Sequence, residues 1–82
     1  MCIINTNATA RNIRLFREMK GLSIETLSKL LGFTSPRAIY HWEHGRCLPS
    51  IDNLVILAEI LGVTVDQLVA TQIINSPAYA GQ

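Results

Sequence analysis

Residues 35–45, Ser-Pro-Arg-Ala-Ile-Tyr-His-Trp-Glu-His-Gly, contain the signals of one short helix and largely decide the fold expected for this chain. Ser35 is of a residue type that caps helices, and Pro36 stands at a first helical position that needs no N–H group. Gly45 comes where glycine accepts the left-handed conformation that ends many helices. We therefore predict a helix that starts at Pro36 and stops before Gly45.

The two faces of this helix differ in chemistry. At about 100° per residue, Ile39, Trp42 and Glu43 share one face, and Ile39 and Trp42 are predicted to lie in the core. The opposite face holds side chains that can contact DNA bases or phosphates: Arg37, His41 and His44, with Tyr40 beside them. For an isolated helix, the simpler interpretation of such a face would be that it is merely exposed to solvent.

A second short helix is predicted immediately before this one, from a cap at Ser23 to a stop at Gly32. Its buried stripe is expected to consist of Leu27, Leu30 and Leu31. Two short helices joined by a glycine-containing turn form a helix-turn-helix motif, in which the second helix enters the major groove of DNA. This context favours DNA binding over a merely solvated face.

Similar start and stop signals predict three further helices, and no segment shows the alternation typical of a strand. The first helix is capped by Asn7 or Thr9 and ends at Gly21, and the last two cover about residues 51–61 and 65–71. The expected fold is all-α, a compact five-helix domain with the helix-turn-helix at helices 2 and 3. The expected division of the chain is a flexible N-terminal arm at 1–8, the domain at 9–72 and a flexible tail at 73–82.

Composition and charge narrow the functional class. The 82 residues are 49% hydrophobic, enough for one small core, and the net charge is +1. All seven Lys and Arg lie in residues 1–46, where three Glu leave a charge of +4, whereas residues 47–82 carry −3. A positive half is typical of a phosphate-binding surface. With two cysteines, no leader and no apolar stretch long enough for a membrane, a cytoplasmic protein with free thiols is expected.

Other chemistry has little support in the sequence. His41, His44 and Cys47 are spaced by three, but the predicted helix ends between them and no fourth metal ligand is evident. No Ser/His or Cys/His arrangement indicates a nucleophile beside a base. We therefore expect a protein that is not an enzyme and that uses no metal or cofactor.

Several short pieces of the sequence occur together in a characteristic order. They are Arg17-x-x-Lys20-Gly21-Leu22-Ser23, Leu27-Ser28-x-x-Leu31-Gly32-Phe33, Ile39-x-x-Trp42-Glu43-x-Gly45, Leu48-Pro49-Ser50, Leu54-x-x-Leu57-Ala58 and Leu61-Gly62-Val63-Thr64-x-Asp66-x-Leu68. In this order they resemble the XRE, or Cro/repressor-like, helix-turn-helix family, whose members have a lambda repressor-like DNA-binding domain. The resemblance runs from about Ile13 to Leu68, most of the chain.

The resemblance implies roles for particular residues. Arg17 and Glu43 stand at the positions of a buried ion pair that holds the first helix against the third. Together with the outward helix face, the resemblance predicts base contacts from Arg37, Tyr40 and His41. Phosphate contacts are expected from the remaining basic and polar side chains around the motif: Arg14, Arg17, Lys20, Lys29, Ser35, His44 and Arg46.

Two features depart from the family pattern. Ile24 stands where relatives usually carry a glutamine that supports phosphate binding, and it cannot form a hydrogen bond through its side chain. The turn Phe33-Thr34-Ser35 is also one residue longer than in many relatives. An exposed Ile24 would suit a protein-binding surface, which keeps a second functional class open.

The function expected from these features is that of a sequence-specific DNA-binding transcription regulator. We expect a repressor that binds double-stranded DNA as a homodimer, on a palindromic operator with half-sites about 10 bp apart. The alternative is a protein-interaction module, antitoxin-like or partner-binding, that keeps the fold without specific DNA binding. Phage-type repressors, restriction-modification controllers and antitoxins all remain open. Dimerisation is expected through apolar residues of the C-terminal part: Val63, Val65, Val69 and Ile73.

Overall fold

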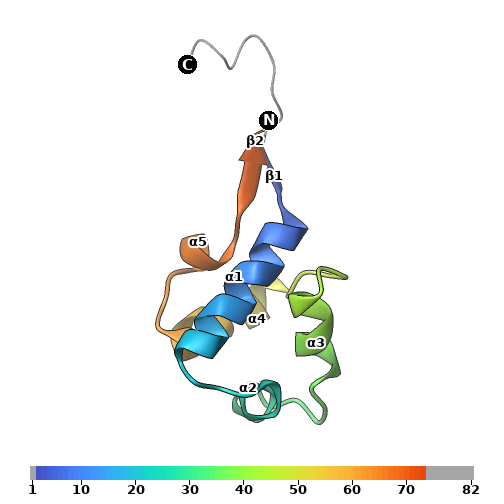
Figure 1. Cartoon of the computed structure of the whole chain (residues 1–82), viewed down its shortest axis with the longest axis vertical. Coiled ribbons are helices and arrows are strands. Elements are labelled where there is room, and N and C mark those ends of the chain that lie inside the picture. Colours follow the sequence, from blue (N-terminus) through green and yellow to red (C-terminus); the bar gives the residue numbers. More distant parts are fainter. Residues whose placement is uncertain (1, 74–82) are drawn as a thin grey trace.

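The computed structural model describes residues 2–73, which form five helices and one short antiparallel pair of strands (Figure 1). The elements in chain order are β1 (Cys2–Ile4), α1 (Thr6–Met19), α2 (Ile24–Leu30), α3 (Arg37–Glu43), α4 (Ile51–Leu61), α5 (Val65–Leu68) and β2 (Thr71–Ile73). The predicted five-helix domain with its helix-turn-helix at the second and third helices is confirmed. The flexible tail expected over 73–82 lies, after Ile73, outside the described residues.

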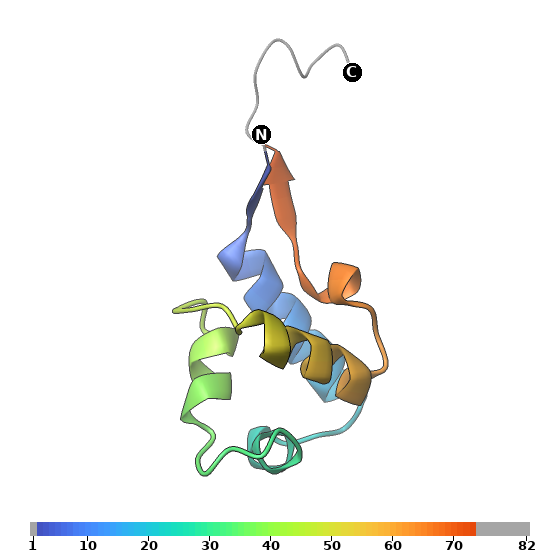
Figure 2. The ribbon, with the colours of Figure 1, turned by 180° about the vertical axis from the view of Figure 1, so that it is seen from behind.

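The two strands were missed by the sequence prediction. β1 and β2 pair with the register Cys2↔Ile73, Ile3↔Gln72 and Ile4↔Thr71, and the ribbon extends from the helical body at the end of the domain opposite α2 (Figures 1 and 2). Strands of three residues are too short to show alternation in the sequence. The arm expected over residues 1–8 therefore holds a strand and the first turn of α1.

Most helix caps lie where their sequence signals predict them. Ser23, Ser50 and Thr64 cap α2, α4 and α5, and Gly62 ends α4 with a φ of +72°. The predicted caps of α1 were wrong, because the side chain of Asn5 accepts a hydrogen bond from the N–H of Ala8 at 3.0 Å. The helix begins as soon as the chain leaves β1, with its cap two residues before Asn7 and four before Thr9.

The third and fifth helices are slightly shorter than predicted. Pro36 is the N-cap of α3 rather than its first residue, and the hydroxyl of Ser35 lies 3.5 Å from the N–H of Arg37. α5 ends at Leu68 because Val69 returns to an extended conformation that leads into β2. The ribbon thus also explains why the last helix stops short of Thr71.

The core takes one fully buried apolar side chain from every helix. These are Ile13, Leu27, Ile39, Leu57 and Leu68, each at 0% exposure. Around them, α4 lies behind α1 in Figure 1 and in front of it in Figure 2. In both views the strand pair lies at one end of the domain and α2 at the other. The fold therefore has one apolar centre that all five helices share.

Trp42 extends this core and packs edge-on against Phe33, with the ring centroids 5.8 Å apart. The prediction that Leu30 is buried was wrong, since it is 54% exposed. Leu27 and Leu31, one full turn apart, face the core, and Leu30 is rotated away from it on this short helix. The two predicted core positions of α3, Ile39 and Trp42, are both buried.

Three hydrogen bonds, which we call the polar clasp, hold the segment before β2 against the start of α1. The hydroxyl of Thr9, which is fully buried, accepts a hydrogen bond from the N–H of Ala70 at 2.9 Å. The amide of Asn12 donates to the carbonyl of Leu68 at 3.1 Å, and the N–H of Asn5 donates to the carbonyl of Ala70 at 2.7 Å. These bonds connect residues far apart in sequence and set where the C-terminal segment lies.

Replacing Thr9 by valine should destabilise the fold by about 1 kcal/mol, because it leaves the N–H of Ala70 without its acceptor at nearly constant side-chain volume. Urea unfolding followed by tryptophan fluorescence measures this change. Thr34→Val is the matched control, since Thr34 is exposed and should change the free energy of unfolding by less than about 0.5 kcal/mol. Equal losses for the two variants would contradict the role of the clasp.

In the part of the chain that the structure describes, no helix is long and apolar enough to cross a membrane.

Candidate nucleic-acid interface

The turn between α2 and α3 is fixed by hydrogen bonds from one buried residue. The hydroxyl of Ser28 donates to the carbonyl of Ser35 at 2.9 Å, and the carbonyl of Ser28 accepts from the N–H of Phe33 at 2.9 Å. Gly32 opens this turn with a φ of +81°, a conformation that favours glycine. The helix pair is therefore held at a defined angle despite the longer turn (Figure 2).

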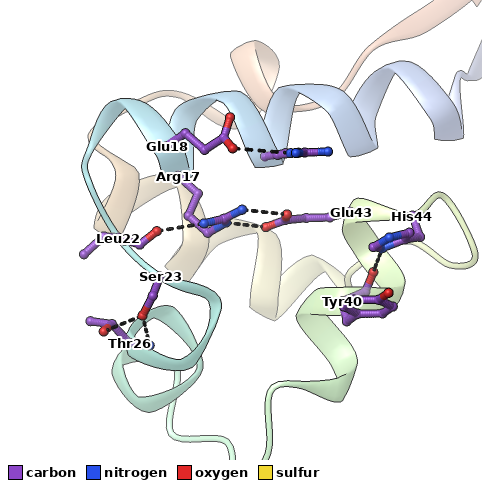
Figure 3. A network of polar contacts seen from close by, with 9 residues as sticks. Arg17, Glu18, Leu22, Ser23, Thr26, Tyr40, Glu43 and His44 are labelled. Carbon is purple, nitrogen blue, oxygen red and sulfur yellow. Dashed lines mark hydrogen bonds and ion pairs between the residues drawn. The ribbon is translucent and has the colours of Figure 1, made fainter.

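An ion pair holds the inner side of α3 against α1 (Figure 3). Nε and Nη2 of Arg17 donate to the two carboxylate oxygens of Glu43, at 2.6 and 3.0 Å. The side chains are only 11% and 3% exposed. Nη1 of Arg17 donates to the carbonyl of Leu22 at 2.8 Å, so the pair also fixes the chain that leads into α2. The geometry is that of a bidentate arginine–carboxylate pair, the strongest form of this contact.

The environment of Arg17 bears on its expected role. The hydrogen bonds to Glu43 raise the pKa of the guanidinium above its ordinary value, burial opposes this shift, and the electrostatic field of the carboxylate adds to it. Arg17 is therefore charged at any physiological pH. All three of its nitrogens are engaged inside the protein, which argues against the phosphate contact expected of it.

The outward face of α3 forms a ridge between two open grooves. Arg37 and His41 line both grooves and make up the ridge. The first groove lies toward the start of α2 and is completed by Ile24, Glu25 and Tyr40 among others. The three residues predicted for base contact, Arg37, Tyr40 and His41, thus lie on one surface of the motif.

The second groove lies on the other side of the ridge. Thr34, Ala38 and Cys47 help to line it. Cys47 is an exposed free thiol, and its place beside the ridge was missed by the sequence prediction because the loop after α3 carries no periodic signal. The described residues contain no cluster of three or more His, Cys, Asp or Glu side chains placed to hold a metal ion.

Tyr40 and His44 form a stacked pair at the end of the outward face (Figure 3). Their ring centroids are 4.0 Å apart with an interplanar angle of 24°. Nδ1 of His44 lies 2.7 Å from the carbonyl oxygen of Tyr40, and a carbonyl only accepts, so Nδ1 carries a proton. Nε2 is therefore the nitrogen of His44 that is left for a phosphate contact.

The other residues expected at phosphates occupy different parts of the surface. Lys29, in the last turn of α2, and Arg46, after α3, are both exposed near the motif. Arg14 lies on α1, where its Nε is 3.4 Å from a carboxylate oxygen of Glu18. The end of the Lys20 side chain lies against the turn at Gly62, which closes α4 rather than α3. Arg14 and Lys20 are therefore less directly placed than Lys29 and Arg46 to contact phosphates when α3 enters the major groove.

Ile24 occupies an intermediate position. It is half-buried and packs against the core, so it is not the fully exposed side chain that a separate protein-binding surface would require. The remaining part of its surface lines the first groove together with Pro36. The apolar substitution at this position thus changes the chemistry of the groove beside α3.

A buried ion pair, a fixed turn and an outward cationic helix face together define a helix-turn-helix domain. Residues 13–68 match the family model described as helix-turn-helix, and the chain belongs to this family, in its XRE-type branch of DNA-binding transcription regulators. None of the curated proteins matches the sequence significantly.

Solved structures with the same fold include two regulators. The restriction-modification controller protein C.AhdI from Aeromonas hydrophila is 30% identical, with a TM-score of 0.70, over 77% of this chain and 94% of that one. The clp gene regulator ClgR from Corynebacterium glutamicum is 27% identical, with a TM-score of 0.70, over 77% of this chain and 66% of that one.

The fold also occurs as part of an enzyme. Hydroxypropylphosphonic acid epoxidase from S. wedmorenis is 24% identical, with a TM-score of 0.72, over 79% of this chain and 34% of that one. This chain therefore spans about a third of the epoxidase, and the likeness shows the fold alone.

Proposed function

We propose that this protein is a sequence-specific transcription regulator, a repressor that binds a palindromic operator as a homodimer. One observation carries the proposal: the ridge of Arg37 and His41 on the outward face of α3, which lies between two open grooves. Family membership and the likeness to C.AhdI and ClgR support a regulatory role. The proposed compartment is the cytoplasm.

The proposed division of contacts follows from the chemistry of each side chain. Arg37 is assigned to guanine, because its guanidinium can pair with O6 and N7 of that base, and Tyr40 and His41 are assigned to neighbouring base edges. Phosphates are assigned to the polar groups that flank the ridge, which are Lys29, Ser35, His44 and Arg46. At greater distance they are assigned to Arg14 on α1 and to Lys20 at the C-cap of that helix. The buried ion pair of Arg17 and Glu43 positions α3 and is assigned no DNA contact.

The experiment that tests this proposal is selection of bound duplexes from a random DNA pool, followed by titration of the enriched duplex at two salt concentrations. A palindrome with salt-sensitive binding is expected, since each phosphate contact releases a counterion. A pool without enrichment would contradict specific DNA binding.

The apolar face of α4 is the surface that we assign to the dimer. Val63 and Val65, expected at a dimer interface, instead pack against the core of the domain. α4 carries exposed apolar side chains of its own, with Ile51 at 78% and Val55 at 47% exposure. Ile56, at 43%, adjoins them. Residues one turn apart on a helix form a continuous stripe, which suits a symmetric contact between two copies.

Ile51→Asp should weaken dimerisation by at least about tenfold, because it places a charge in an apolar contact. Sedimentation equilibrium measures the dimer constant, and the palindrome should lose affinity while a single half-site keeps it. Leu15→Asp is the matched control, since Leu15 is 52% exposed on α1 and is assigned no role in the dimer. Unchanged sedimentation of Ile51→Asp would refute the assigned interface.

A protein-interaction module is the second candidate function. Leu15 and Met19 favour it, because they lie one turn apart on α1 and are 52% and 72% exposed. Such a pair suits an apolar partner surface outside the DNA-facing side. The duplex selection separates the two functions, since a module without DNA binding enriches no sequence.

A further inference from the structure

The first groove beside α3 has an unusual lining for a surface that would meet DNA. Its walls include Ile24 at the start of α2, Pro36 at the cap of α3 and the ring of Tyr40, which is 49% exposed. Arg37 and Glu25 supply the charges of the same groove. Ser35 and His41 complete the lining, so the groove combines apolar side chains with two polar ones, one cation and one carboxylate.

This lining suits a base edge better than a phosphate. Ile24 has no side-chain donor, and Pro36 has no backbone N–H. The carboxylate of Glu25 would repel a phosphate brought into the groove. A base edge instead offers neutral groups, and in the major groove the apolar one is the C5-methyl group of thymine.

We infer that this groove holds the C5-methyl group of a thymine that neighbours the guanine contacted by Arg37. The inference rests on the proposed function and specifies what its site reads. Ile24, Pro36 and the ring of Tyr40 supply the apolar contacts to the methyl group, and Arg37 lies in the same groove, where it can reach the next base. The stack of Tyr40 on His44 holds the tyrosine ring in place for this contact.

The test uses the duplex enriched by selection and replaces its thymines by deoxyuridine, one position of the half-site at a time. Deoxyuridine keeps the base pair and removes only the methyl group. At one position we expect about fourfold weaker binding for a change in one half-site, and about fifteenfold for both, from the burial of one carbon. Fluorescence anisotropy titrations with purified full-length protein measure the ratio.

Variants of the groove connect this ratio to Ile24. Ile24→Ala should reduce the thymine-to-deoxyuridine ratio at that position to below about twofold, whereas Ile24→Val should keep most of it. Leu30→Ala is the matched control on the same helix, because Leu30 is 54% exposed outside the groove, and it should leave the fourfold ratio unchanged. Because both duplexes are bound by the same preparation, a partly unfolded variant still reports a valid ratio.

The outcomes distinguish the inference from the function beneath it. A ratio near one at every thymine, on a duplex that still binds with salt dependence, overturns the methyl contact and leaves DNA recognition intact. A fourfold ratio that Ile24→Ala does not change overturns the placement of the methyl group in this groove. Failure to enrich any duplex overturns the proposed function, and the inference falls with it.

Discussion

Replacing Glu43 by leucine should destabilise the domain by about 3–5 kcal/mol, because it leaves the charge of Arg17 buried without a partner. The two side chains are 11% and 3% exposed and share two short hydrogen bonds. A domain of this size has a total stability of about 5–15 kcal/mol, so the variant would lie close to the unfolding threshold. Glu43→Leu should therefore also lose DNA binding indirectly, through the position of α3.

Urea unfolding of the single and double variants measures this effect. The double variant Arg17→Met/Glu43→Leu should recover most of the lost stability, since an apolar pair of similar volume needs no compensation of charge. Arg14→Met is the matched control: the exposed pair of Arg14 and Glu18 should contribute less than about 0.5 kcal/mol. A double variant no more stable than Glu43→Leu would show that the pair does more than neutralise its own charges.

The features that could be predicted from sequence depend on local chemistry. Ser23, Ser50 and Thr64 cap helices with their hydroxyls, and the amide oxygen of Gln67 completes the capping box by accepting from the N–H of Thr64. Each of these helix starts is therefore determined by a window of four residues. The turn at Gly62 is equally local, since a φ of +72° favours glycine. Helical periodicity is also a local signal, and it was enough to predict which residues lie on the outward face of α3.

The features that could not be predicted depend on pairing across the chain. The cap at Asn5 follows from the ribbon, whose two strands are about seventy residues apart, and no short sequence window contains both. The packing of Val63 against the core and the engagement of Lys20 beside Gly62 likewise depend on how α4 and α5 close the fold. The groove at Ile24 required the angle between α2 and α3, which buried Ser28 sets through the turn.

Arg37→Ala should reduce discrimination at one base pair of each half-site by about 1–3 kcal/mol, while other positions keep their preference. Arg37 is exposed at the first position of α3 and forms part of the ridge between both grooves, where a guanidinium can reach a guanine edge. The loss should be largest for the enriched sequence and absent for a duplex that already carries the wrong base. Titration of the enriched duplex and its single-base variants measures this pattern.

Lys29→Ala provides the comparison that gives this result its meaning. Lys29 is exposed in the last turn of α2, so a phosphate contact from it should strengthen binding to all sequences alike. Its removal should weaken every duplex by a similar factor and lower the salt slope by about 1. If both variants weakened all duplexes equally, Arg37 would be a phosphate contact and base reading would have to come from His41 or Tyr40. A loss of discrimination at one base pair for Arg37→Ala, together with a uniform loss of affinity for Lys29→Ala, would establish that α3 reads the sequence while α2 anchors the protein to the DNA backbone.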